Sequence, residues 1–326
     1  MILLYIAILA IGFVCLIKGA DLFVDGASSL ARIFKVSGAV IGLTVAALGT
    51  SAPELAVSTS AALKGANEIA LSNVLGSNVF NLLVVLGICA AIKPLPVDKG
   101  ILKRDFPVSI IFTGVLMVLT SGACLLSRSF MTTDMTVTAG NVTRPVGLIL
   151  SVCFVLYIIW IVVDAKRHPA EDQEEIKSRP LWKCILLIII GLIMIVIGGQ
   201  AVVISARELA RAFGMTETLI GLTVVALGTS LPELVTSIVA ARKGETGLAV
   251  GNVVGSNIFN LLFIMGVSSS IHPIAVNMAS LYDMAILIGI SLVTYVFCLS
   301  GKKINRAEGI IMVLMYSAHM IFAALR

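Results

Sequence analysis

The chain alternates between long apolar runs and short polar breaks. About 20 apolar residues suffice to cross the hydrocarbon core of a bilayer, so each run is predicted to be a transmembrane helix. Ten are expected, over residues 2–22, 37–63, 68–92, 105–126, 145–164, 183–206, 216–241, 246–271, 280–299 and 306–325. The first run lacks a basic n-region and a clear cleavage site, which favours a retained span over a signal peptide.

One block of the sequence occurs twice. Residues 41–94 align without a gap with residues 220–273, at a constant offset of 179 and with 31 identities in 54 positions. Each half holds five spans, an odd number, so the second copy must enter the membrane from the opposite side. The sequence therefore predicts an all-α integral membrane protein of ten transmembrane helices, built as two inverted five-helix repeats. Such repeats place a transport site near the middle of the membrane.

A charged segment separates the two halves. DAKRHPAEDQEEIKSRP, at residues 164–180, is the one long and strongly charged stretch, and it is too polar to bury a core. The predicted domains are a first five-helix repeat (1–163, with its motif at 41–94), a linker (164–182) and a second five-helix repeat (183–326, with its motif at 220–273).

Composition and charge agree with a membrane protein and give it an orientation. The chain is 59% hydrophobic and only 13% charged, which excludes an ordinary soluble domain. With the N-terminus outside, sixteen Lys and Arg residues fall in inside loops and six at outside ends. The positive-inside rule then predicts a multi-pass cell-membrane protein with both termini outside and the linker in the cytoplasm. The six cysteines are scattered and form no CxxC pair, so they are predicted to be packing residues. The sequence implies no nucleic acid and no protein partner.

Both copies of the block carry an acid deep in an apolar run, in the motifs GTSAPEL and GTSLPEL. Glu54 and Glu233 each cost several kcal/mol there unless they are protonated, paired or bound to a cation. Pro53 and Pro232 each remove a helical hydrogen bond, so nearby carbonyl groups need another partner. These features favour a cation site, although neutral structural acids and ordinary proline kinks are the plainer alternatives.

The rest of the block adds neutral oxygen atoms that can coordinate a cation. They lie in the GTS residues of GTSAPEL and GTSLPEL and in a second motif of each copy, GSNVFN and GSNIFN. The donors are Thr50, Ser51, Ser77, Asn81, Thr229, Ser230, Ser256 and Asn260. Residues four apart, such as Ser77 and Asn81, share a helix face. A set of oxygen ligands without His or Cys suits hard cations such as Ca²⁺ and Na⁺, while neighbouring acids also make protons competitors. Asn73, Asn78, Asn252 and Asn257 can equally be polar contacts between helices.

These two motif pairs resemble the alpha-repeats of the calcium/cation antiporter superfamily, in particular the prokaryotic form of its sodium/calcium exchanger branch. The resemblance implies a transporter and not an enzyme, with Ca²⁺ and Na⁺ as substrates and no cofactor. It implies that Glu54 and Glu233 bind Ca²⁺ and share in Na⁺ binding, together with the carbonyl groups of Thr50 and Thr229. The remaining implied ion ligands are Ser51, Ser77, Ser230 and Ser256, the carbonyls of Ala47 and Ala226, and Asn81 and Asn260, which line the middle.

The predicted function is secondary active antiport of Na⁺ and Ca²⁺ by alternating access at a two-glutamate site in the middle of the membrane. Some family members carry Asp where this chain has Asn260, and the lost charge argues against potassium dependence. The proton/calcium branch usually has an acid in a GNxxE-like motif, where this chain reads SNVLG and GNVVG. A proton-coupled antiporter of Ca²⁺ or another divalent cation is therefore the alternative.

Two other classes fit less well. A cation channel needs a continuous pore, and an intramembrane aspartyl protease needs a YD motif paired with a GxGD motif, of which the sequence lacks GxGD. Small residues in GADLFVDGA (19–27) and GGQAVVISA (198–206) suggest that the first and sixth spans move during transport, with static packing as the alternative.

Overall fold

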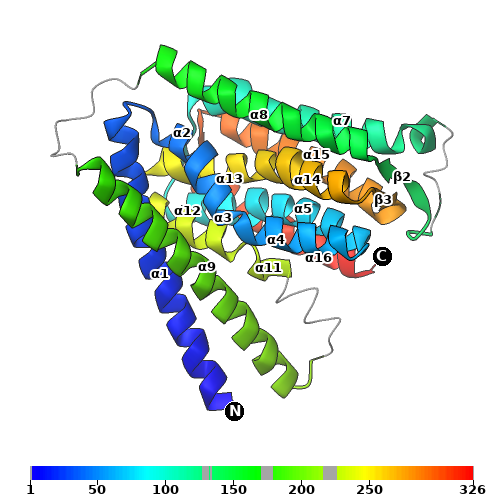
Figure 1. Cartoon of the computed structure of the whole chain (residues 1–326), viewed down its shortest axis with the longest axis horizontal. Coiled ribbons are helices and arrows are strands. Elements are labelled where there is room, and N and C mark those ends of the chain that lie inside the picture. The colour runs from blue at the N-terminus through cyan, green and yellow to red at the C-terminus, as the bar shows by residue number, and fades with distance from the viewer. Residues whose placement is uncertain (1, 127–131, 133, 170–178, 216–225, 326) are drawn as a thin grey trace.

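The computed structural model describes residues 2–126, 132, 134–169, 179–215 and 226–325 and is helical almost throughout (Figure 1). Its helices are α1 (Ile2–Ile33), α2 (Gly38–Ile41), α3 (Ala47–Thr50), α4 (Ala52–Leu63), α5 (Asn67–Phe80), α6 (Leu86–Ile92), α7 (Phe106–Leu126), α8 (Arg144–Arg167), α9 (Leu181–Ala212), α11 (Ala226–Gly228), α12 (Leu231–Lys243), α13 (Thr246–Ile258), α14 (Met265–Ile271), α15 (Met278–Leu299) and α16 (Arg306–Leu325). Short π-helical turns continue several of them, at Gly42–Ala46, Asn81–Val85, Ile101–Asp105 and Phe259–Ile264.

The helices confirm the membrane class. Within the described part of the chain, eight helical segments are long and apolar enough to cross a membrane, and a ninth forms if the bent pair Gly38–Thr50 and Ala52–Leu63 is one span. Large apolar side chains such as Leu3 and Leu126 are exposed on the outer surface, where a bilayer would cover them. The predicted span 216–241 begins outside the described residues.

Four short strands were not expected from the sequence. β1 (Leu95–Pro96) pairs antiparallel with β4 (Lys303–Ile304), and β2 (Thr138–Val142) pairs antiparallel with β3 (Ile274–Asn277). Each lies in a connection between long helices, where backbone N–H and C=O groups need partners. Hydropathy does not encode a pairing between connections that lie so far apart in the chain.

Helices α1 and α9 lie side by side and antiparallel, set obliquely to the other helices (Figure 1). Glycines allow this close approach: a Cβ atom on Gly19 would lie 2.8 Å from Met194 Cβ and 2.9 Å from the Gly191 carbonyl oxygen. Both helices are longer than predicted, because they continue past residues 22 and 206 to Ile33 and Ala212. Their motion stays a prediction, as does the alternative of static packing.

Helix α13 forms the centre of the molecule. Nearly all of its residues are buried, and the segment that contains α2 crosses it closely. A Cβ atom on Gly251 would lie 2.4 Å from the Ala39 carbonyl oxygen, and one on Gly255 would lie 2.6 Å from Leu43 Cα. The two repeated blocks are therefore in backbone contact, which brings their polar motifs into one place.

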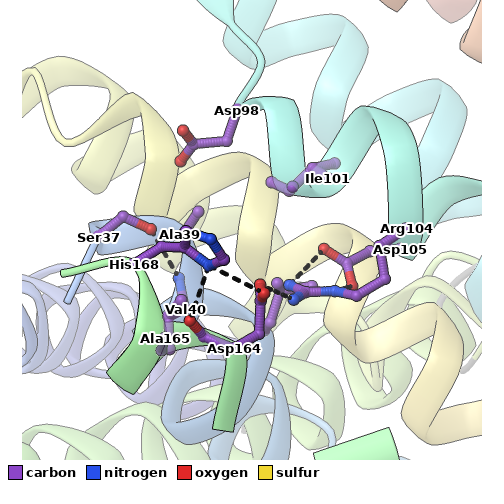
Figure 2. Close-up of a pocket in the computed structure, with 12 residues that line it drawn as sticks. Ser37, Ala39, Val40, Asp98, Ile101, Arg104, Asp105, Asp164, Ala165 and His168 are labelled. Carbon is purple, nitrogen blue, oxygen red and sulfur yellow. Dashed lines mark hydrogen bonds and ion pairs between the residues drawn. The ribbon is translucent and has the colours of Figure 1, made fainter. Parts of the chain in front are cut away.

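A buried ion pair lies within the π-helical turn that precedes α7, and its side chains contact α8 (Figure 2). The Asp105 side chain is fully buried, and its Oδ1 atom accepts hydrogen bonds from Arg104 Nε at 2.7 Å and from the Tyr157 hydroxyl at 2.9 Å. Arg104 also binds Asp164. Arg104, Asp105 and Asp164 line a cavity of about 330 Å³ together with Asp98.

Candidate functional site

Two helix breaks build the site. Helix α3 ends at Thr50 and α4 begins at Ala52, and the segment Gly38–Thr50 meets α4 at an angle of 48°. Helix α12 begins in the same way after Ser230, and a proline in its first turn has no N–H group that would need a partner. Glu54 and Glu233 therefore lie in the first turns of α4 and α12, where the unpaired backbone N–H groups of a helix favour negative charge.

Each repeated block holds the acid of the other. The Ser51 hydroxyl donates to Glu233 Oε1 at 2.7 Å, and the Ser230 hydroxyl lies 3.0 Å from Glu54 Oε1. The Ser77 hydroxyl is 3.3 Å from the same Glu54 oxygen. Both glutamates are fully buried. The structure thus brings together the two acids that the sequence singled out, with serines from both blocks around them.

A layer of asparagines lies next to the acids. Asn78 Nδ2 donates to the Asn257 carbonyl at 3.2 Å, and Asn257 Nδ2 donates back to the Asn78 carbonyl at 3.3 Å. Asn260 Nδ2 lies 2.9 Å from Asn78 Oδ1 and 3.2 Å from Ser77 Oγ, while Asn81 Nδ2 donates to Asn257 Oδ1 at 3.1 Å. The amide N–H groups of Asn81 and Asn260 are thereby used within the protein, which leaves their oxygens for a ligand.

Six of the predicted residues carry a buried side-chain oxygen without a hydrogen-bond partner in the described structure. These atoms are Glu54 Oε2, Glu233 Oε2, Asn81 Oδ1, Asn260 Oδ1, Thr229 Oγ1 and Ser256 Oγ. Buried polar atoms in proteins nearly always have a partner, because an unsatisfied one costs about 1–3 kcal/mol. A ligand for these oxygens must be positively charged or a strong hydrogen-bond donor.

The composition of the donor set decides which ligand fits. Over the described ranges, no three His, Cys, Asp or Glu side chains come close enough together to hold a metal. An ion at this site would therefore be held by two carboxylates and by neutral hydroxyl, amide and carbonyl oxygens. Hard cations such as Ca²⁺ and Na⁺ accept such ligands, whereas zinc and copper prefer nitrogen or sulfur.

Three further predicted ligands, Thr50, Ala47 and Ala226, would act through their backbone carbonyl groups. The Thr50 hydroxyl donates to the Ala46 carbonyl at 3.0 Å or to Asn252 Oδ1 at 3.1 Å, so its side chain is engaged in packing and only its carbonyl can face an ion. The Ala47 carbonyl accepts the Ser51 N–H at 3.1 Å and keeps one lone pair. Ala226 begins α11, and its side chain and residues 216–225 lie outside the described structure.

Sequence reasoning missed how the supporting residues act. Asn252 Nδ2 binds Ser237 Oγ at 3.0 Å, and in the other block Asn73 Nδ2 binds Ser58 Oγ at 2.9 Å. Both bonds join the helix of the acid to the helix that follows it. The signal was present, since these two Ser–Asn pairs occupy equivalent positions in the repeated blocks.

Comparison with known proteins gives one consistent result. A family model described as sodium/calcium exchanger protein matches residues 4–163 and 183–325. The putative antiporter CaxA of Alkalimonas amylolytica is 38% identical over 317 residues, which cover 94% of each chain. The sodium/calcium exchanger MaX1 of Methanosarcina acetivorans is 32% identical, over 96% of this chain and 97% of its own. A structure of the sodium-calcium exchanger NCX_Mj superposes with a TM-score of 0.82 at 33% identity, over 100% of both chains.

Proposed function

This chain belongs to the sodium/calcium exchanger protein family, and we propose that it exchanges Na⁺ for Ca²⁺ across a membrane at the site formed by Glu54 and Glu233. The observation that carries the proposal is the set of six buried, unpartnered oxygen atoms, two of them on these carboxylates. One Ca²⁺ neutralises both acids, and two or three Na⁺ ions can do so in its place.

The same two acids account for coupled transport. Without an ion, two carboxylates would stand unneutralised in a medium of low dielectric constant, where the energy of a bare charge is high. The empty protein is therefore prevented from changing the side to which the site opens. Because only the ion-loaded forms cross over, movement of Ca²⁺ in one direction requires movement of Na⁺ in the other.

The proposal includes the inverted arrangement of two five-helix units, 1–163 and 183–326, joined by the linker 164–182, with both termini outside and the linker in the cytoplasm. Two reciprocal contacts support it, since Ser51–Glu233 corresponds to Ser230–Glu54 at the offset of 179, and the Asn78–Asn257 pair corresponds to itself. Strands β1 and β3 also begin at positions 179 residues apart, and each follows the third long helix of its unit.

The direct test is ion flux in proteoliposomes with one gradient imposed at a time. We expect ⁴⁵Ca²⁺ uptake when the vesicles are loaded with Na⁺ and diluted into Na⁺-free buffer. Uptake driven by a proton gradient and not by Na⁺ would replace this proposal with proton/calcium antiport. Uptake that needs no opposing gradient would indicate a channel.

Asn260→Asp is expected to change ion preference, and it also removes the hydrogen bond that the Asn260 amide donates to Asn78 Oδ1. The substitution adds a third acid beside the pair, so the Ca²⁺ concentration for half-maximal transport should fall by about tenfold, which corresponds to about 1.4 kcal/mol. Transport should also become more sensitive to acid pH, because three neighbouring carboxylates share protons. Competition of Na⁺, K⁺ and H⁺ with ⁴⁵Ca²⁺ measures both effects.

Asn141→Asp, on the exposed part of β2, is the matched control and should leave competition unchanged. If Asn260→Asp also leaves the competition of all three ions unchanged, residue 260 is not part of the transport site.

A further inference from the structure

A second set of oxygen atoms binds a cationic group at the far end of α12. Lys243 Nζ lies 2.8 Å from Asp25 Oδ1, 3.2 Å from Asp21 Oδ1 and 3.0 Å from the Asp21 carbonyl oxygen. The two aspartates are four residues apart on α1, so both side chains point to the same face. Three oxygens from one helix thus surround the ammonium group of another.

Asp25 and Lys243 line a polar cavity of about 350 Å³. The Ser28 hydroxyl lines it as well; this residue is only 6% exposed, and its oxygen has no hydrogen-bond partner in the described part of the chain. The other basic groups at the cavity are held by acids, with Arg32 3.2 Å from Glu245 Oε1 and Arg179 3.5 Å from Asp25 Oδ2. A buried, unpartnered hydroxyl among carboxylates indicates room for one more ligand.

One face of α12 leads from this cavity to the transport site. Glu233, Thr236, Ala240 and Lys243 follow each other at intervals of three or four residues, so they lie in one row along the helix. The row is about 15 Å long, from the helical rise per residue. Thr236 is fully buried, and its hydroxyl has no partner within the described ranges. Helix α1 packs against α12, and the row spans the distance between the two acidic sites.

The acid pair occurs in only one of the two halves. At the offset of 179, Asp21 and Asp25 correspond to Gln200 and Ile204 on α9. Those two residues line a cavity of about 220 Å³ whose other walls are mostly apolar. The repeat alone does not account for the two aspartates on α1, which also carries Lys18 and Arg32.

We propose that Asp21 and Asp25, with Ser28, form a second cation-binding site at the mouth of the ion path, and that Lys243 occupies it until a transported cation displaces the ammonium group. This inference rests on the proposed function, because it gives the site its cation, Ca²⁺ or Na⁺. With Lys243 in place, Arg32, Arg179 and Lys243 balance Asp21, Asp25 and Glu245. Withdrawal of Lys243 leaves one net negative charge, which attracts a metal ion.

Lys243→Met is the direct test, in proteoliposomes of known orientation. It should lower the Ca²⁺ concentration for half-maximal exchange by about three- to tenfold on the side where Lys243 lies, because the site then lacks its tethered competitor, and should leave the opposite side unchanged. Asp25→Asn should raise that concentration on the same side only. Lys243→Arg keeps the charge and should resemble the unmodified chain, as should Arg242→Met, a change to the neighbouring basic residue.

A binding measurement separates this site from the transport site. In the Glu54→Gln/Glu233→Gln double variant, calorimetric titration with Ca²⁺ should detect one weak site that strengthens when Lys243→Met is added and disappears when Asp21→Asn and Asp25→Asn are added. The inference is wrong if none of these changes alters Ca²⁺ binding and if the Ca²⁺ concentration for half-maximal exchange stays the same or shifts equally on both sides. Lys243 would then only hold α1 against α12. Failure of the unmodified chain to exchange Na⁺ for Ca²⁺ would instead overturn the proposed function.

Discussion

Replacement of either buried glutamate by glutamine is expected to reduce Na⁺-driven ⁴⁵Ca²⁺ uptake by about 100-fold or more. Each change removes one of the two charges that neutralise the ion, and loss of one partner of a buried charge pair costs about 3 kcal/mol or more. About 1.4 kcal/mol corresponds to a factor of ten. The uptake rate of Glu54→Gln or of Glu233→Gln should therefore be at least two orders of magnitude below that of the unmodified chain. Initial uptake rates in proteoliposomes measure it.

The variants should remain folded, which separates loss of the site from loss of the protein. Replacing a buried carboxylate by an amide of the same shape removes an unneutralised charge, so the apparent Tm in ion-free detergent buffer should stay the same or rise. The stabilisation that Ca²⁺ gives to the unmodified chain should disappear. Glu208→Gln, which changes a partly exposed acid paired with Arg211 on α9, is the control and should keep full uptake. Uptake that survives both single changes would remove the transport site from these motifs.

The sequence predicted the acids and their neighbours because polar groups stand out in an apolar run. A carboxylate, hydroxyls and a proline inside a membrane span each have a cost, and their repetition at a constant offset indicated a shared role. The structure brings Ser51 to Glu233 and Ser230 to Glu54. The family was likewise accessible, since it is carried by the local motifs around these residues.

Helix lengths and long-range partners were harder to predict. The predicted first span stopped near residue 22 because Asp21 and Asp25 interrupt the apolar run, yet α1 continues to Ile33. Lys243, more than 200 residues away, provides an opposite charge to both aspartates. Likewise, the sequence placed Asn260 in the middle of the site but did not show that its amide group binds Ser77 and Asn78. Local patterns identify residues that need a partner, but only the packing of the helices determines which partner each one finds.

The buried ion pair Arg104–Asp105 next to α7 likewise depends on partners that helix packing supplies. Its disruption is expected to have the largest effect on stability. Arg104 is the only basic side chain that the structure brings to the fully buried Asp105, in the part of the chain that it describes, and the Tyr157 hydroxyl supplies the remaining contact to Asp105 from another helix. Arg104→Met should lower the free energy of unfolding by about 3–5 kcal/mol, because it leaves a carboxylate buried without a counter-charge. The apparent Tm of the purified protein, measured by loss of monodisperse protein on heating, should fall accordingly.

A double change distinguishes a stranded charge from a packing defect. Asp105→Asn in the Arg104→Met background removes the unneutralised carboxylate, while the amide can still accept the Tyr157 hydrogen bond, so most of the lost stability should return. Asp164→Asn is the matched control: that carboxylate also binds Arg104, but its side chain is 39% exposed, and its loss should change stability by less than about 1 kcal/mol. If the double variant is no more stable than Arg104→Met alone, the contribution of Arg104 comes from its contact with the Trp160 ring, 5.5 Å from the guanidinium group, and not from its charge.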